Sequence, residues 1–242
     1  MSKTKDRHGY LKFVEQEKEV NILQYLTGIR SPSNHTISDV QFWPVEGGTV
    51  ISMPAAGGYL TSLKDRNEQL WSVALQLVEA VAFMHEHNVA HMDLKPRNVI
   101  IPPEGGRLSI IDFSVSIRVR SPDARYSGVV GTEDYIAPEV RGGWYRPMLA
   151  DLWSCGRTLQ ELCVGCHPSV DRATLLQISR QLMDQDPEAR PKMSTVLERM
   201  APTRRGGSAV LHATPYVEVS RGFRSRLLLP MQGIPDSTYT CA

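Results

Sequence analysis

The sequence has few cysteines and no long apolar run. Its 242 residues include four cysteines, too few and too scattered for the disulfide framework of a small secreted protein. No apolar segment approaches the roughly 20 residues that cross a bilayer, and the N-terminal ten residues lack the hydrophobic core of a secretion signal. We therefore expect reduced cysteines, no membrane contact and a cytoplasmic or nuclear location.

The chain also lacks a net charge of either sign. It carries 27 Lys and Arg against 26 Asp and Glu, a net charge of +1. Without a basic excess there is no overall field that attracts nucleic acid, so we predict no nucleic-acid partner. The 41% hydrophobic and 22% charged content is typical of a globular protein, large enough for one domain or for two lobes around a cleft. The oligomeric state has no signature in the sequence.

The hydrophobic periodicity predicts a mostly helical body after a small β-containing region. Apolar residues spaced three and four apart indicate helices, and β-rich runs joined by glycine-containing turns indicate hairpins. The expected helices cover residues 11–27, 68–87, 149–164, 172–183 and 194–200, and the expected hairpins cover 37–53 and 99–111. Residues 113–147 have no sustained period.

Residues with catalytic potential lie close together in the run HMDLKPRN, residues 91–98. Asp93 can accept a hydroxyl proton, and Lys95 can neutralise the charge of a transferring phosphate. Asn98 precedes the first strand of the 99–111 hairpin, and Asp112 follows the second strand. Together these residue types are suited to metal-assisted phosphoryl transfer.

The hairpin predicts how Asn98 and Asp112 meet. If its loop centres near Gly105, then Asn98 faces Asp112 and Ile100 faces Ile110, with the facing Cβ atoms roughly 5 Å apart. An amide oxygen and a carboxylate at one strand end are ligands that Mg²⁺ accepts. We therefore expect a magnesium site between Asn98 and Asp112.

An ordered series of motifs resembles the signature of eukaryotic-type protein kinases. HMDLKPRN resembles their catalytic loop and Asp112-Phe113-Ser114 their metal-binding triplet. The downstream motifs are GTEDYIAPE at 131–139, DLWSCG at 151–156 and DPEARP at 186–191. The resemblance covers roughly residues 11–200 and implies an α+β, protein-kinase-like bilobal fold. The helical C-lobe would follow an incomplete β-containing N-lobe.

The resemblance implies roles for individual residues. Asp93 would be the catalytic base with Lys95 beside it, and Asn98 and Asp112 would hold Mg²⁺ with ATP. Thr132 would belong to the platform for a protein substrate, and Lys95 with Thr132 matches the serine/threonine-specific pattern.

Further roles follow from the same resemblance. Glu139 and Arg190 would form a structural ion pair. Glu19 would be the glutamate of the N-lobe helix, and the hinge residues Met53 and Ala55 would contact ATP. The implied domains are a partial N-lobe over residues 1–56, a C-lobe over 57–202 and a C-terminal tail over 203–242 that we expect to be disordered.

Three departures from the family pattern bear on function. Nothing before Glu19 resembles a Gly-rich loop, so the sheet is expected to be truncated. Lys3 or Lys5 could serve as the nucleotide-binding lysine, and Lys3 is our candidate because it precedes Glu19 by a workable distance. Met92 replaces the arginine that would hold a phosphorylated activation loop, which predicts that such phosphorylation is not the switch. Ser114 replaces glycine after Asp112-Phe113, which predicts altered loop mobility.

The sequence thus favours a serine/threonine protein kinase that uses ATP and Mg²⁺ and acts on a protein substrate. The missing Gly-rich loop keeps a second hypothesis open, an interaction scaffold with the kinase fold and little catalysis. A small-molecule phosphotransferase of the same fold is disfavoured by the segment 131–139, which shapes a peptide platform in the family.

Overall fold

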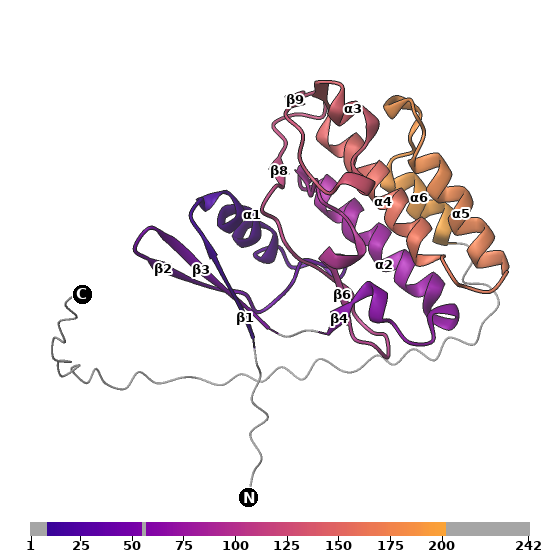
Figure 1. Ribbon diagram of the computed structural model, residues 1–242, viewed down its shortest axis with the longest axis horizontal. Helices are drawn as coiled ribbons and strands as arrows, with labels where there is room; N and C mark the ends of the chain where they lie inside the picture. Colours follow the sequence, from indigo (N-terminus) through magenta and orange to yellow (C-terminus); the bar gives the residue numbers. More distant parts are fainter. Residues whose placement is uncertain (1–8, 55–56, 202–242) are drawn as a thin grey trace, which may run out of the picture. The chain divides into compact units, whose positions relative to one another are not determined.

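The computed structural model describes residues 9–54 and 57–201. In these residues a small antiparallel sheet with one helix precedes a mostly helical body (Figure 1). The α-helices are α1 (Glu17–Thr27), α2 (Arg66–Glu86), α3 (Pro138–Arg141), α4 (Pro147–Leu162), α5 (Val170–Leu182) and α6 (Met193–Met200). The strands are β1 (Tyr10–Val14), β2 (Gln41–Val45), β3 (Gly48–Met53), β4 (Gly58–Tyr59), β5 (Val89–Ala90), β6 (Val99–Ile101), β7 (Ser109–Ile110), β8 (Ile117–Arg118), β9 (Tyr126–Ser127) and β10 (Trp144–Tyr145).

The first sheet has the strand order β1-β3-β2. The predicted hairpin over 37–53 is confirmed as β2 and β3, which pair from Val45 and Gly48 outward. The prediction of a helix from residue 11 is wrong at its start, because residues 10–14 form β1 and the helix begins only at Glu17. All five residues of β1 pair with β3, and this pairing satisfies backbone groups that a short isolated helical turn would leave open to water.

The hairpin of β6 and β7 is confirmed, but its predicted register is wrong by one residue. Val99 pairs with Ile110, and Ile100 pairs with Ser109. Gly105 and Gly106 both adopt positive φ angles in the connecting loop, a conformation that glycine reaches without steric cost. The loop therefore closes asymmetrically, and Ile111 rather than Asp112 lies opposite Asn98, with the Ile111 amide donating to the Asn98 carbonyl at 3.0 Å.

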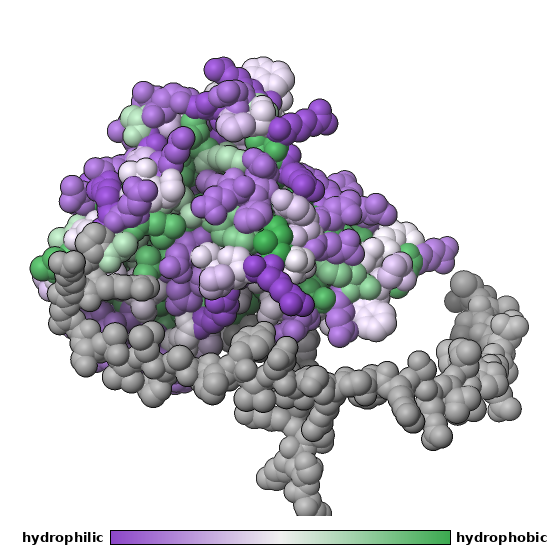
Figure 2. Space-filling view, turned by 180° about the vertical axis from the view of Figure 1, so that it is seen from behind, coloured by the Kyte–Doolittle hydropathy of each residue, from purple (hydrophilic) through white to green (hydrophobic). Residues whose placement is uncertain are grey.

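The helical body is built around α2, which contacts α4, α5 and α6. Ten residues of α2 are buried, because apolar positions extend beyond a single stripe of the helix. The predicted helices over 68–87, 149–164, 172–183 and 194–200 are confirmed as α2, α4, α5 and α6, with boundaries shifted by a few residues. On the face seen in Figure 2, hydrophilic side chains cover most of the surface and hydrophobic ones form scattered patches.

The segment 113–147 contains only short elements, as its lack of periodicity predicted. They include β8, β9, β10 and the four-residue α3. Met92 packs in a small buried cluster with Val119, Val140 and Tyr145. The methionine therefore anchors this segment through apolar contact. Among the helices of the described residues, none combines the length and apolar content needed to span a membrane.

Candidate active site

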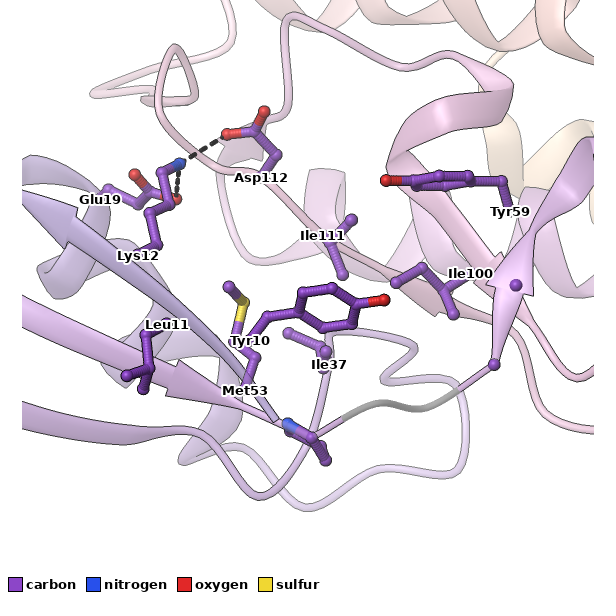
Figure 3. A pocket seen from close by; sticks show the side chains of 13 residues that line it. Tyr10, Leu11, Lys12, Glu19, Ile37, Met53, Tyr59, Ile100, Ile111 and Asp112 are labelled. Atoms are coloured by element: carbon purple, nitrogen blue, oxygen red, sulfur yellow. Dashed lines mark hydrogen bonds and ion pairs between the residues drawn. The ribbon is translucent and has the colours of Figure 1, made fainter. Parts of the chain in front are cut away.

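A cavity of about 340 Å³ opens beside the first sheet (Figure 3). One end is polar and the other is apolar. The polar end is formed by Lys12, Glu19 and Asp112, and the apolar part by Ile37, Met53, Ile100 and Ile111, with Tyr10 and Tyr59 also lining the space. Its volume lies near the lower end of the roughly 300–1,000 Å³ of small-molecule sites.

The polar end is organised by Lys12 of β1. Its ammonium group lies 2.8 Å from Glu19 Oε1 and 2.8 Å from Asp112 Oδ1 (Figure 3). Glu19 lies on α1. Asp112 follows β7 and is 100 residues from Lys12 in the sequence. One cation therefore joins a strand, a helix and a distant loop at the mouth of the cavity.

The contact between Lys12 and Asp112 shifts the pKa values of both side chains. Partial burial acts to lower the pKa of Lys12, but hydrogen bonds and charge attraction from Asp112 and Glu19 outweigh it and raise the pKa. Burial likewise acts to raise the pKa of Asp112, but the hydrogen bond and charge of Lys12, with a hydrogen bond from Ser114, lower it overall. At neutral pH the cluster is therefore a cation between carboxylates.

Asp112 owes its position to an unusual backbone angle. Its φ is 63°, in the left-handed region that non-glycine residues rarely occupy. The next residue, Phe113, is fully buried and packs against the His91 ring at 4.9 Å between centroids. The buried ring fixes the loop, so that Asp112 is directed toward Lys12. Ser114 is not among the residues with positive φ, so glycine is not required at that position in this conformation.

A second cluster surrounds Asp93. Thr132 donates its hydroxyl to Asp93 Oδ1 at 2.7 Å. Lys95 donates to Asp93 Oδ2 at 2.7 Å and to Thr132 Oγ1 at 2.6 Å. The Asn98 amide donates to Asp93 Oδ2 at 3.0 Å and to the Asp93 carbonyl at 2.8 Å. Three side chains therefore orient a single carboxylate, as a positioned general base requires.

Asp151 of α4 holds the backbone of the loop that carries Asp93. This carboxylate is fully buried and accepts hydrogen bonds from the backbone amides of His91 at 2.6 Å and Met92 at 2.7 Å. His85 also lies 3.2 Å from it. A buried carboxylate must be paired in this way, and the pairing secures the backbone next to Asp93.

Asn98 and Asp112 do not face each other as the predicted register required. The one-residue difference places Ile111 opposite Asn98, and the left-handed φ of Asp112 takes its side chain out of the strand pattern. The Asn98 amide nitrogen is committed to Asp93, which leaves Oδ1 as its ligand atom. Each residue still offers an oxygen of the kind that Mg²⁺ accepts.

Away from the cavity, Glu139 and Arg190 form a two-pronged ion pair. The Arg190 guanidinium donates to Glu139 Oε1 at 2.6 Å and to Oε2 at 2.8 Å. The same guanidinium also donates to the carbonyls of Asp184 and Leu149. This buried fork joins α3 to the segment before α6, which suits a structural role.

The structure brings together most of the residues that the sequence singled out. Glu19 and Met53 line the cavity, while Lys3 and Ala55 lie outside the described residues. Sequence reasoning missed Lys12, since it assigned residue 12 to a helix. The signal available was the content of Tyr10–Val14, since Tyr, Phe and Val are residues that favour strands.

Comparison with known proteins gives a consistent result. The family model described as a protein kinase domain matches residues 18–202. Serine/threonine-protein kinase 36 of Pongo abelii is 30% identical over 186 residues, or 72% of this chain. CBL-interacting serine/threonine-protein kinase 5 of Arabidopsis thaliana is 35% identical over 153 residues, or 59% of the chain.

A yeast protein shares a shorter segment. Serine/threonine-protein kinase HAL5 of Saccharomyces cerevisiae (strain YJM789) is 42% identical over 96 residues, or 37% of this chain. The chain covers 11% of the length of that protein, 14% of the Pongo abelii kinase and 34% of the Arabidopsis thaliana kinase. The similarity therefore concerns one domain of longer proteins.

Proposed function

The chain belongs to the protein kinase domain family, and from that membership we propose that it is a serine/threonine protein kinase. It would transfer the γ-phosphoryl group of ATP to a hydroxyl group of a protein substrate. The observation that carries this proposal is the pair of clusters described above. Asp93 is oriented by Lys95, Thr132 and Asn98, and Lys12 is held between Glu19 and Asp112.

The residues of the cavity fit ATP. Its base would lie in the apolar part formed by Met53, Ile100 and Ile111, and its phosphates would lie toward Lys12. The raised pKa keeps Lys12 charged at neutral pH, so it would attract and orient phosphate oxygens. Glu19 would hold the ammonium group in place after a phosphate displaces part of its contact with Asp112.

The residues also fit Mg²⁺. Asp112 is half-buried with a lowered pKa, so its carboxylate is ionised, and Asn98 supplies an amide oxygen. Both are hard oxygen ligands. Bound there with ATP, Mg²⁺ would supply neutralisation of the phosphate charge.

Asp93 would accept the proton of the substrate hydroxyl at a carboxylate oxygen. Its orientation by Lys95, Thr132 and Asn98 holds the carboxylate ready without a rearrangement at the moment of reaction. Lys95 would remain next to the oxygen that receives the proton and stabilise negative charge on the transferring group. Thr132 would position the substrate chain beside the same carboxylate.

Phosphate transfer by the purified chain with ATP and Mg²⁺ tests the proposal. We expect incorporation of labelled γ-phosphate into the chain or a serine/threonine peptide library, and its loss in Asp112→Asn. Asp123→Asn, which alters an exposed carboxylate paired with Arg146, is the matched control and should retain activity. If neither the natural chain nor Asp112→Asn transfers phosphate, the result contradicts the proposal and favours the scaffold hypothesis.

A further inference from the structure

Tyr10 lines the cavity from the same strand as Lys12. It lies two residues before Lys12 on β1, and side chains two apart in a strand project from the same face. Both therefore point toward the cavity that they line, whereas the side chain of Phe13 lies on the other face of the strand. Pairing with Met53 on β3 fixes the position of the Tyr10 backbone.

The ring of Tyr10 lies in the apolar part of the cavity. In Figure 3 it extends from β1 between Met53 and Ile100, with its hydroxyl directed toward Ile100. This part of the cavity is the place available to a planar base when phosphates lie at Lys12. A tyrosine ring is comparable in size to a nucleotide base, so the ring and the base compete for one space.

Nothing among the described residues ties the ring in place. Tyr10 is 61% exposed, and its hydroxyl makes no hydrogen bond within the described part of the chain. Side chains with this exposure change rotamer within nanoseconds. The ring can therefore turn toward solvent and leave the apolar part open, with no buried contact to break.

We propose that Tyr10 is a rotameric gate over the base-binding half of the cavity, which must turn outward before a nucleotide enters. This proposal rests on the proposed nucleotide function of the same site. Only the fraction of molecules with the ring outward is competent to bind, so the apparent dissociation constant rises by the inverse of that fraction. Tyr10 would thus lower nucleotide affinity and restrict the size of the base.

Calorimetric titration of the full chain with adenosine tests the gate. Adenosine has no phosphate, so its binding does not depend on Lys12 or Asp112. For Tyr10→Ala we expect affinity increased by about tenfold, which corresponds to an outward ring in about one molecule in ten. Adenosine with a benzyl group on its exocyclic nitrogen should bind Tyr10→Ala and not the natural chain.

Two variants serve as controls. Tyr10→Phe keeps the ring and should bind adenosine like the natural chain, because the gate acts through ring size. Phe13→Ala removes an aromatic ring from the other face of β1 and should also leave adenosine binding unchanged. A melting temperature for each variant confirms that the exposed substitutions leave the fold intact.

The remaining outcomes separate the gate from the proposed function. Tighter adenosine binding by Tyr10→Ala without phosphate transfer by any chain supports the gate and contradicts the kinase proposal. Equal binding by Tyr10→Ala and the natural chain, or binding by neither, overturns the gate, because removal of the ring then opens no usable space. Weaker binding by Tyr10→Ala also overturns it and shows that the ring stacks on the base.

Discussion

Two groups of charged side chains hold the loops of this protein, and they differ most in their access to solvent. The Asp151 side chain is fully buried, and so is the Arg190 side chain that pairs with Glu139. Lys12 and Asp112 keep 33% and 38% of their side-chain surface open to solvent. The buried group can only stabilise the fold, whereas the open group remains available to a ligand.

This difference in solvent access indicates which charged residues stabilise the fold and which are available for chemistry. A buried charge that loses its partner cannot be solvated by water instead. Removal of the partner therefore lowers the free energy of unfolding. A half-exposed pair is screened and solvated, so its loss changes stability little. Substitutions in the two groups should therefore produce opposite results in unfolding and activity measurements.

The largest effect on stability is expected at the buried fork. Arg190→Met leaves Glu139 unpaired and removes donors from two carbonyls, so the free energy of unfolding should fall by roughly 3–5 kcal/mol. Urea denaturation measures this change. Arg141→Met is the matched control, because Arg141 pairs with Glu133 at the surface, and its cost should stay within about 1 kcal/mol.

The double variant sharpens this result. Arg190→Met combined with Glu139→Leu removes the stranded carboxylate and should be more stable than the sum of the single changes predicts. Equal costs for Arg190→Met and Arg141→Met would show that burial does not distinguish the two pairs.

Within the open group, Lys12→Met should reduce phosphate transfer by about 10²–10³-fold, the loss typical of one removed electrostatic contact in an active site. Its melting temperature should change little. Steady-state transfer rates at saturating ATP and Mg²⁺ measure the effect. Lys3→Met and Lys18→Met should both retain activity; loss in Lys3→Met with activity kept in Lys12→Met would reverse the assignment of the phosphate-binding lysine.

The smallest effect is expected from pH and concerns buried His35. Burial lowers its pKa, supported by the charge of Arg107, although the hydrogen bond to the Leu108 carbonyl and the nearby Glu79 carboxylate act in the opposite direction. The unfolded chain therefore binds a proton more readily than the folded one. The contribution to stability should be complete above about pH 6.5 and decrease as the pH falls below that value.

Denaturation of the natural chain and of His35→Gln measures this contribution. The range from about pH 5 to about pH 8 is suitable because it brackets the ordinary histidine pKa of about 6.5. The stability of His35→Gln should depend less steeply on pH in the acidic half of the range. Parallel curves for the two chains would show that another group is responsible for the acid sensitivity.

The sequence predicted the elements of the helical body well and the first strand badly. The helix α2 combines a long apolar period with a Pro-free interior, so local pattern and tertiary packing agree. Tyr10–Val14 is too short for its strand-favouring residues to outweigh the helical pattern that continues into α1. Only the pairing with β3 decides that these residues form a strand, and this decision brings Lys12 into the site.

The candidate site divides in the same way. Asp93, Lys95 and Asn98 meet because they lie within six positions of one loop, so their cluster could be predicted from spacing. The position of Asp112 relative to Asn98 could not, since the predicted pairing of the two depended on a hairpin register that differs by one residue in the structure. A shift of that size changes the partner of every residue in a hairpin.

By itself the sequence determined the order of the motifs, the helical character of the body and the identity of the residues around Asp93. These follow from patterns within a few turns or a single loop. The tertiary structure alone decided which lysine reaches Asp112, where the ring of Tyr10 lies and which charges are buried. Those properties depend on contacts between segments up to a hundred residues apart, and only the packed chain brings such segments within the reach of a side chain.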